Sequence, residues 1–367
     1  MNGRYPDSEQ RLSRRGFLAV SAGGAALAVC PPRLLAATGG QERVRLLNAP
    51  TRVFKLRDNS RENAESWLFH LAVETAAGDE VEPVEMDVEH RSRGEVLETV
   101  TLRQTAVAAL RVATMTRQVG ISGERLAEPV QWQLYRIRAS RPAALATDEV
   151  RIAMRLRDAA GAAVSAQHSV PIGTYTARTS LIFPFRGRGY ISNAQANDGG
   201  HPNRSGQFAV DALGVDENYA PVSSPEDVNS AYVGFGRELV APAAGTVVRA
   251  RGDRPDQPVT SRSDPAYFAP EYPNGGDVGN HVVIDHGGGE FSLLAHMMAD
   301  SVLVEVGEAV RQGQPVGKLG NSGDTNGPHV HYQLQSGPDW PSADALPVTF
   351  TNLSVPNLVR GTFFRAT

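Results

Sequence analysis

Short runs in which apolar and polar residues alternate dominate the chain from residue 43 to about residue 172. The best strand candidates lie at 66–73 (SWLFHLAV), 96–102 (VLETVTL), 131–139 (QWQLYRIRA), 149–156 (EVRIAMRL) and 164–171. A period of two buries one face of a strand and exposes the other. Ala159, Ala160 and Gly161 predict a hairpin turn between the last two runs. Strands at this spacing favour an immunoglobulin-like β-sandwich over residues 43–175.

A different pattern follows a linker-like passage at residues 173–180. Each of four further runs predicts strand, turn and strand, with glycine at the tight corners: 237–249, 280–287, 290–297 and 302–320. Because little helical periodicity is present, we expect an antiparallel β-domain over residues 181–365. The polar stretches 214–236 and 253–279 predict inserted loops. Loops of that length in a compact domain are usually functional or mobile.

The first 37 residues have the pattern of an export signal. Paired arginines in SRRGFL (residues 13–18) precede an apolar run at 18–29. Small residues suited to a cleavage site, Ala36 and Ala37, follow. This order is typical of the twin-arginine route. The apolar run is too short for a transmembrane helix, which needs about 20 residues. We therefore expect cleavage after Ala37, no stable membrane insertion, and a protein of the periplasm or cell envelope.

Charge and cysteine content narrow the possible chemistry. The formal net charge of −4 gives no indication of a nucleic-acid partner. The single cysteine, Cys30, lies in the leader, so the mature chain has neither a disulfide nor a thiolate ligand. A lipidated Cys30 is disfavoured by the bulky Val29 before it. A zinc site would therefore use His and carboxylate ligands, the combination typical of catalytic zinc with an open position for water.

Histidine is concentrated in the second part of the chain. In NSGDTNGPHVHYQLQ (residues 321–335), His329 and His331 alternate along a predicted strand, so both imidazoles project from one face. By itself an HxH pair is more often a solvated or structural feature than a site. The isolated histidines of the first part, His70, His90 and His168, are interpreted as structural or surface residues.

A series of spaced motifs surrounds the histidine pair. They are QFAVDALG around Asp211, LVAPAAGTVV at 239–248, NHVVIDHGGGEFSLLAH at 280–296 and a glycine-punctuated run at 302–332 that ends in HVHY. Together they resemble the LytM/lysostaphin-type zinc endopeptidases, which are cell-wall metallopeptidases with a small antiparallel β-fold. Such a series is far more specific than a lone HxH. The resemblance covers about the second half of the chain and implies zinc-dependent hydrolysis of peptidoglycan peptides.

The resemblance also implies roles for single residues. Asp211 and His331 would bind Zn²⁺. His296 and His329 would be catalytic groups that line the site and interact with the attacking water or the developing oxyanion, because imidazoles exchange protons near neutral pH. His281, which begins a predicted strand, and His286, which precedes a glycine turn, are weaker candidates and are interpreted as structural residues or as partners of the ligands.

The third ligand is where this chain departs from the family pattern. The family has a histidine four residues before the aspartate, and that position is Gln207 here. An amide oxygen is a poor zinc ligand. We expect His201 to take its place, because Gly199, Gly200 and Pro202 allow the chain to fold this imidazole back toward the metal.

Two other functions remain open at this point. A non-catalytic LytM-like module that binds cell wall or activates a separate amidase is favoured by Gln207, while the four matching site residues favour activity. Alternatively, the sandwich could carry the function by binding wall or a partner, or could position the second domain or cover its groove.

Overall fold

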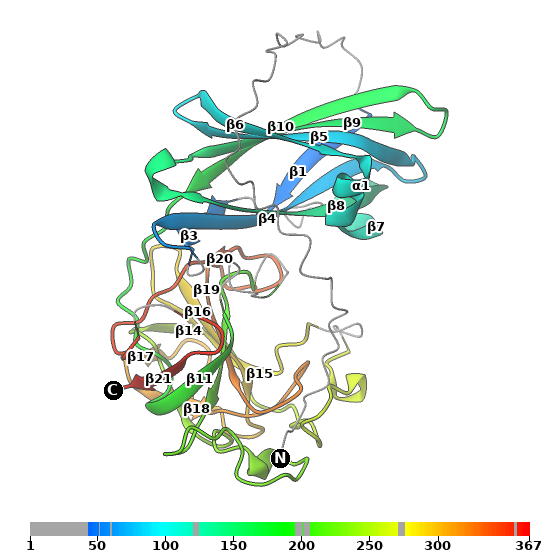
Figure 1. Cartoon of the computed structure of the whole chain (residues 1–367). Helices are drawn as coiled ribbons and strands as arrows, with labels where there is room; N and C mark the ends of the chain where they lie inside the picture. The colour runs from blue at the N-terminus through cyan, green and yellow to red at the C-terminus, as the bar shows by residue number, and fades with distance from the viewer. Residues whose placement is uncertain are drawn as a thin grey trace. The chain divides into compact units, whose positions relative to one another are not determined.

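The computed structural model describes residues 43–50, 52–58, 61–119, 125–194, 201, 206–270, 276–355 and 358–367. All of them belong to one compact unit, residues 42–367. The predicted leader, residues 1–37, lies outside the described residues. The fold is mainly β, as predicted (Figure 1). Within the described ranges, no helix combines the length and apolarity needed to cross a bilayer.

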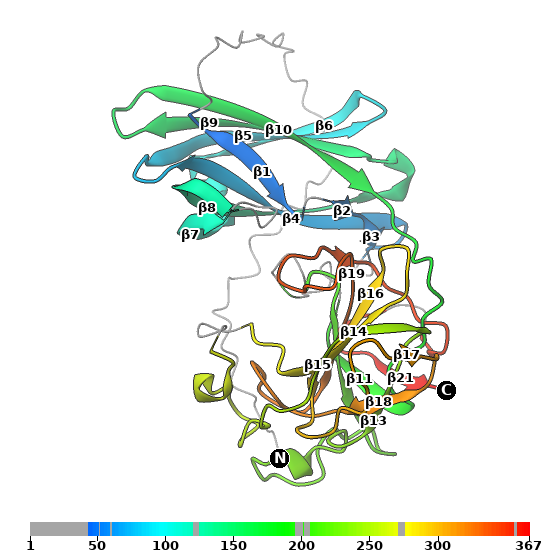
Figure 2. The same cartoon turned by 180° about the vertical axis from the view of Figure 1, so that it is seen from behind.

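Two sheets build the first part of the fold (Figure 2). One has the order β1-β4-β8-β7, with β3 on β4, and consists of β1 (Arg45–Ala49), β3 (Leu56–Arg57), β4 (Ala64–Ala76), β7 (Arg111–Val119) and β8 (Arg125–Pro142). The other has the order β2-β10-β9-β5-β6 and consists of β2 (Val53–Phe54), β5 (Val81–Ser92), β6 (Glu95–Arg103), β9 (Glu149–Asp158) and β10 (Ala163–Gly173). Only β2 and β10 pair in parallel among these neighbours.

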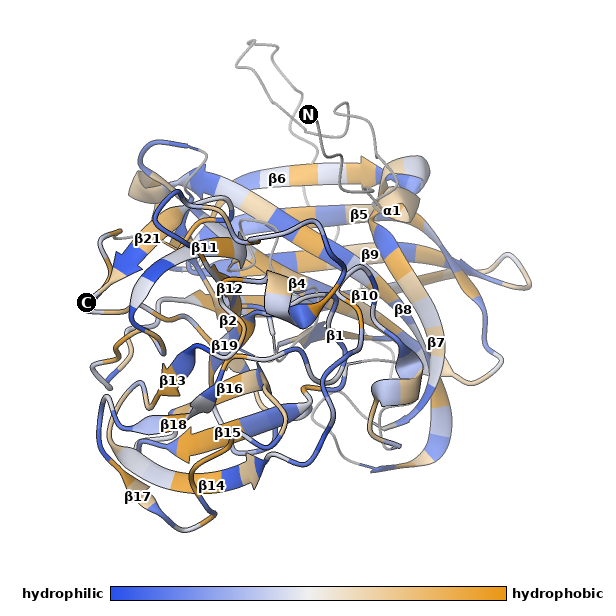
Figure 3. Ribbon diagram, turned by 90° about the horizontal axis from the view of Figure 1, so that it is seen from below, coloured by the Kyte–Doolittle hydropathy of each residue, from blue (hydrophilic) through white to orange (hydrophobic). Residues whose placement is uncertain are grey.

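The two sheets share one hydrophobic core. Phe69 of β4 and Tyr135 of β8 meet Met86 of β5 and Ile152 of β9 in a single buried cluster. Bands of alternating hydropathy run along these strands in Figure 3, as the period of two requires. This part is therefore a β-sandwich; its immunoglobulin-like character and the limits 43–175 stay predictions.

The sandwich also contains elements that the alternating pattern did not single out. Strands β1, β2, β3, β5 and β7 were not predicted. Helix α1 (Gln104–Leu110), which packs Val107 into the core, was not predicted either. The short helix η1 (Ala143–Leu145) follows β8. In β5 the alternation is interrupted at Pro83, where a bulge shifts the register to β9. The hairpin turn predicted at Gly161 is confirmed, because its N–H donates to the Asp158 carbonyl at a positive φ of 82°.

His90 on β5 makes the stability of the sandwich depend on pH. Its side chain is buried, and its ring packs edge-on against Trp67 with the centroids 5.7 Å apart. Burial, and then the charge of Arg141, lowers the pKa of His90 from 6.5 to about 4. Because the unfolded chain binds this proton more readily, stability is lost as the pH falls from 6.5 toward 4. The loss is up to about 3 kcal/mol, since one pKa unit corresponds to about 1.4 kcal/mol.

We expect His90→Leu to weaken this pH dependence. Urea titrations at a series of pH values between 7 and 4, followed by tryptophan fluorescence, report mainly on the sandwich because it contains Trp67 and Trp132. Some dependence remains in the variant, because burial and Arg136 also lower the pKa of His70 to about 4. An unchanged slope in His90→Leu contradicts the assignment.

A nine-stranded antiparallel sheet forms the centre of the second part, as predicted. Its main path is β17-β14-β15-β16-β19-β12-β11-β21, and β20 pairs with β19. The bounds are β11 (Gly187–Asn193), β12 (Val210–Gly214), β14 (Gly245–Arg251), β15 (Asn280–Asp285), β16 (Phe291–Met297), β17 (Ala309–Val310), β19 (Val330–Gln335), β20 (Ala345–Leu346) and β21 (Phe363–Ala366). A two-stranded sheet of β13 (Glu238–Val240) and β18 (Pro315–Lys318), with the short helices η3 (Asn229–Ala231) and η4 (Pro265–Tyr267), completes it.

The two faces of strand β19 have different surroundings. Val330, Tyr332 and Leu334 are fully buried in the main hydrophobic cluster of this part. The alternate residues therefore lie on the opposite face, beside the smaller apolar cluster that includes Leu293 and Ala295. Histidine and glutamine occupy these alternate positions, so the second face is polar along β19.

The passage predicted as a linker, residues 173–180, is held by a buried carboxylate. Glu290 is 1% exposed and accepts hydrogen bonds from the Tyr175 hydroxyl and from the N–H groups of Arg178 (2.8 Å) and Thr179 (2.9 Å). Phe54 of β2 belongs to the main cluster of the second part. The connection between the two parts is thus packed, while the limits 181–365 stay a prediction.

Candidate metal centre

Three neighbouring strands bring polar side chains onto one face of the central sheet. Asp211 of β12 lies directly opposite His331 of β19, and Asn193 of β11 lies opposite Asp211. Paired residues in an antiparallel ladder share a face. Residues that are far apart in the sequence therefore form one short row across the sheet.

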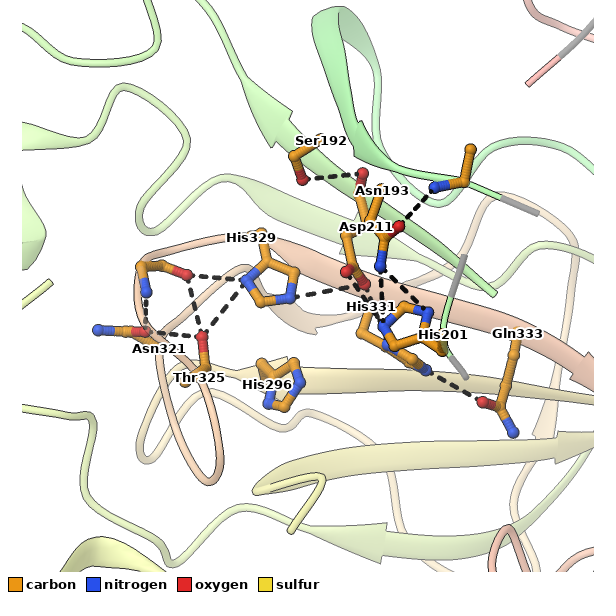
Figure 4. A network of polar contacts seen from close by, with 12 residues as sticks. Ser192, Asn193, His201, Asp211, His296, Asn321, Thr325, His329, His331 and Gln333 are labelled. Atoms are coloured by element: carbon orange, nitrogen blue, oxygen red, sulfur yellow. Dashed lines mark hydrogen bonds and ion pairs between the residues drawn. The ribbon is translucent and has the colours of Figure 1, made fainter. Parts of the chain in front are cut away.

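Two imidazoles approach the Asp211 carboxylate (Figure 4). His331 Nδ1 lies 3.0 Å from Oδ1, and His201 Nε2 lies 3.2 Å from Oδ2. One donor atom of each residue lies within 4.8 Å of those of the other two. Two imidazoles and a carboxylate are a donor set that fits zinc and leaves a position for water. His201 is the only residue between positions 195 and 205 that the structure describes.

The Asp211 carboxylate is ionised at this position. Burial raises its pKa, but the cationic forms of His201 and His329, together with hydrogen bonds from His201 and His331, lower it more. The net result is a pKa well below the usual value. A carboxylate that stays deprotonated is available to a cation at every ordinary pH.

Gln207 is directed away from this cluster and into a different contact. Its side chain is 3% exposed, and Nε2 donates to the carbonyl of Leu68 on β4 at 2.6 Å. Oε1 has no hydrogen-bond partner among the described atoms. In the described part of the chain, the cluster of potential metal ligands contains His201, while the amide of Gln207 is engaged with Leu68.

His329 presents one ring nitrogen to the site. Its Nδ1 lies 2.8 Å from the Gly327 carbonyl, which can only accept, so Nδ1 carries the proton. Nε2 lies 3.6 Å from Asp211 Oδ1 and holds a lone pair when the ring is neutral. The turn that precedes His329 is fixed by Asn321. Its Oδ1 accepts hydrogen bonds from Thr325 Oγ1 (3.0 Å) and from the Gly327 N–H (3.1 Å).

His296 reaches the site because the backbone of β16 changes conformation at this residue. Ala295 lies opposite His331, so simple alternation would direct the next side chain to the other face. His296 instead has a φ of 55°, which is uncommon for a residue other than glycine. Its ring centroid lies 4.9 Å from that of His329 and 5.8 Å from that of His331. A positive φ at a functional position is where backbone strain is typically found.

The proton of His296 is also positioned. Nδ1 lies 2.8 Å from the Ser322 carbonyl and therefore donates. Burial, and then the charges of His329 and His331, lowers the pKa of His296 well below its usual value. The ring is thus neutral near pH 7, with a lone pair on Nε2.

The predicted loop at 253–279 is held against this turn where the structure describes it. Asp256 Oδ1 accepts from the Asn321 N–H at 2.7 Å, and Asp324 Oδ2 accepts from the Gly276 N–H at 2.7 Å. Gly279 has a φ of 62°, and a Cβ there would collide with the Ser322 carbonyl that holds His296. The loop at 253–279 is therefore tied directly to the turn that carries His329.

The other histidines of the second part have structural contacts. His281 Nδ1 lies 2.8 Å from the Gly279 carbonyl; His286 lies 2.8 Å from the Ala244 carbonyl and 2.7 Å from Ser292 Oγ. Sequence reasoning missed Asn193, Asn321, Gln333 and Gln335, which surround the cluster. The last two could have been found from the alternation, because they continue the polar face of HxH along the same strand.

Comparisons with known proteins match part of this chain. Residues 231–341 match Peptidase family M23. This range contains His296, His329 and His331, while His201 and Asp211 precede it. Similar proteins include two from Vibrio cholerae. Peptidoglycan DD-endopeptidase ShyA is 43% identical over 56 residues, which are 15% of this chain and 13% of that protein. Peptidoglycan DD-endopeptidase ShyC is 35% identical over 99 residues, 27% of this chain and 19% of that protein.

Each match therefore spans less than a fifth of the relative's length. Among solved structures, the catalytic domain of a mutant of the prophage-encoded M23 protein EnpA from Enterococcus faecalis is similar at 19% identity with a TM-score of 0.29. That similarity covers 47% of this chain and 95% of the other.

Proposed function

Because the chain carries a peptidase family M23 domain at residues 231–341, we propose that it is an exported zinc-dependent endopeptidase that hydrolyses peptide bonds of peptidoglycan. The family match agrees with the LytM/lysostaphin-type resemblance of the sequence motifs. The names of the two Vibrio cholerae relatives support peptidoglycan as the substrate. The observation that carries the proposal is the cluster of His201, Asp211 and His331, with two further imidazoles beside it.

In this proposal three residues bind the metal and a separate histidine transfers protons. His201, Asp211 and His331 hold the zinc, which when bound would polarise the peptide carbonyl and lower the pKa of water. His329 accepts a proton from the attacking water at Nε2, because Nδ1 is already committed to the Gly327 carbonyl. The same nitrogen then delivers that proton to the leaving amine.

His296 has a supporting part in the proposed mechanism. Its neutral ring, held through Nδ1 by Ser322, keeps Nε2 as a hydrogen-bond acceptor beside His329. The inserted loops at 214–236 and 253–279 form walls of the substrate groove, which supports selection among short peptides. The anchoring of the second loop through Asp256 and Asp324 supports this role.

Metal analysis and turnover of purified peptidoglycan test the proposal together. The full chain is expected to retain about one zinc per molecule and to release soluble peptides, and chelation is expected to stop the release. Asp211→Ala serves as the matched variant without the carboxylate. A folded, zinc-free protein that binds peptidoglycan without cleaving it would instead identify a non-catalytic module.

Export depends on the paired arginines in this proposal. Replacing both Arg14 and Arg15 by lysine is expected to hold the precursor in the cytoplasm, because the twin-arginine route recognises that pair. Cell fractionation of the wild type and the double variant measures this. Unchanged export of the variant would contradict the assignment of residues 1–37.

A further inference from the structure

Aromatic side chains lie beside the metal cluster, on the same face of the central sheet. Tyr190 of β11 lies opposite Leu213 of β12, and Leu213 is two residues along that strand from Asp211. Phe363 of β21 lies opposite Tyr190. Paired residues share a face, and so do alternate residues of one strand. Both rings therefore project from the face that carries Asp211 and His331.

A third ring comes from the loop at 214–236. The Tyr219 ring centroid lies 5.2 Å from that of Phe363, which in turn lies 4.9 Å from that of Tyr190. The guanidinium of Arg188 lies 5.3 Å from the Tyr219 ring centroid, a cation–π contact that holds this ring in place. We call Tyr190, Tyr219, Phe363 and Arg188 the aromatic ledge. It is built from two strands and a loop that are distant in the sequence.

The aromatic ledge is open to solvent. Tyr219 is 47% exposed and Phe363 is 44% exposed. Single exposed apolar residues are ordinary, whereas several that touch one another mark a binding surface. The ledge therefore presents flat apolar rings next to the metal cluster.

The backbone at Tyr219 favours glycine, yet the chain has an aromatic residue there. Its φ is 63°, in the left-handed region that bulky side chains rarely adopt. Asp216 closes the turn: its carbonyl accepts from the Tyr219 N–H (3.2 Å), and its Oδ1 accepts from the N–H groups of Asn218 and Ala220 (both 2.8 Å). Glycine would form this turn with less strain, so the turn does not account for the tyrosine. Strain of this kind is typical of positions whose side chain is used.

We propose that the aromatic ledge binds sugar rings of the peptidoglycan glycan strand while the attached peptide reaches the metal cluster. The inference rests on the proposed function for the identity of the substrate. The C–H faces of a pyranose ring are apolar and flat enough to stack on Tyr219 and Phe363, and Arg188 offers hydrogen-bond donors to sugar oxygens.

The position of the ledge suits a sugar that is joined to the peptide. Tyr190 lies diagonally from Asp211, at about 7–8 Å, and the next strand, which carries Phe363, adds about 5 Å. An extended peptide spans about 3.3–3.6 Å per residue. About two to four residues between the cleaved bond and the sugar therefore match the distance from the metal cluster to the ledge.

Sugar binding can be measured without any peptide hydrolysis. An NMR titration of the full chain with the tetramer of N-acetylglucosamine is expected to show binding. Tyr219→Gly removes one ring and suits the backbone, so the variant is expected to bind the tetramer roughly 2- to 10-fold more weakly, with an unchanged or higher melting temperature. Phe363→Ala is expected to weaken binding similarly. Leu303→Ala, which shortens another apolar side chain that is 64% exposed, is the matched control and is expected to bind like the wild type.

Two substrates connect the ledge to turnover. Intact peptidoglycan presents sugar and peptide together, whereas cross-linked peptides released from the same material by an amidase carry no sugar. In Tyr219→Gly the rate on intact peptidoglycan is expected to fall roughly 2- to 10-fold relative to the rate on the free peptides. A wild type that does not bind the tetramer, equal binding by Tyr219→Gly, or an unchanged ratio of the two rates would overturn the inference. Tetramer binding that depends on Tyr219, in a chain that cleaves neither substrate, would sink the proposed function and leave the sugar site standing.

Discussion

Replacing His201 by alanine is expected to abolish zinc retention, whereas Gln207→Ala is expected to retain the metal. Removing His201 leaves a single imidazole and a carboxylate, too few donors for a stable zinc site. Zinc affinity should fall by more than the roughly 10- to 100-fold loss that follows removal of a residue that contacts a ligand without binding the metal itself. Metal analysis after dialysis against a weak chelator measures both variants.

Gln207→Ala is a demanding control because its position matches the usual first ligand of the family pattern. The variant loses a buried hydrogen bond to the Leu68 carbonyl. It should therefore unfold more easily, by about 1 kcal/mol, while still holding zinc. Circular dichroism of both variants verifies that each is folded. Zinc loss in Gln207→Ala, with zinc kept in His201→Ala, would reverse the assignment of the third ligand.

Replacing His329 by alanine is expected to lower peptidoglycan turnover by about 10²- to 10⁴-fold and to leave zinc bound. That range is typical for the removal of a group that transfers a proton in the transition state. His329 contacts Asp211 only at 3.6 Å, and the donors of His201, Asp211 and His331 form the cluster without it. Release of soluble peptides and zinc content are measured on the same preparation.

The contrast with His331→Ala makes this test specific. His331 lies on β19 and His329 directly precedes this strand, yet His331→Ala should lose metal and activity together. His168→Ala, in the sandwich, should affect neither, since His168 contacts Asn48 on β1. Loss of zinc in His329→Ala, or normal turnover in that variant, would contradict the division of roles between the two residues.

Much of the fold could be predicted from the sequence because strand alternation is a local property. Antiparallel β-structure in both parts, the hairpin at Gly161 and the polar face of HxH each follow from neighbouring residues. The missed strand β5 has Pro83 and a bulge, which interrupt the period of two. Helix α1 was missed because its seven residues are too short for a helical period to be recognised.

The site could be predicted only in part, because its members are brought together by long-range pairing. The family motifs placed Asp211, His296, His329 and His331 in one site, and the structure brings these residues together with His201. The motifs could not indicate the backbone conformation of His296. Its φ of 55° breaks the strand alternation from which the direction of a side chain is inferred. They also could not indicate that Gln207 contacts Leu68, a residue 139 positions away.

The sequence by itself determined the fold class and the common face of His329 and His331. These properties depend on composition and on the two-residue period of a strand. Only the tertiary structure decided that Asp211 lies opposite His331, that His201 approaches the same carboxylate, and that the ring of Tyr219 meets that of Phe363. Strand register and the approach of a distant loop depend on packing across the whole sheet, so local sequence patterns do not contain them.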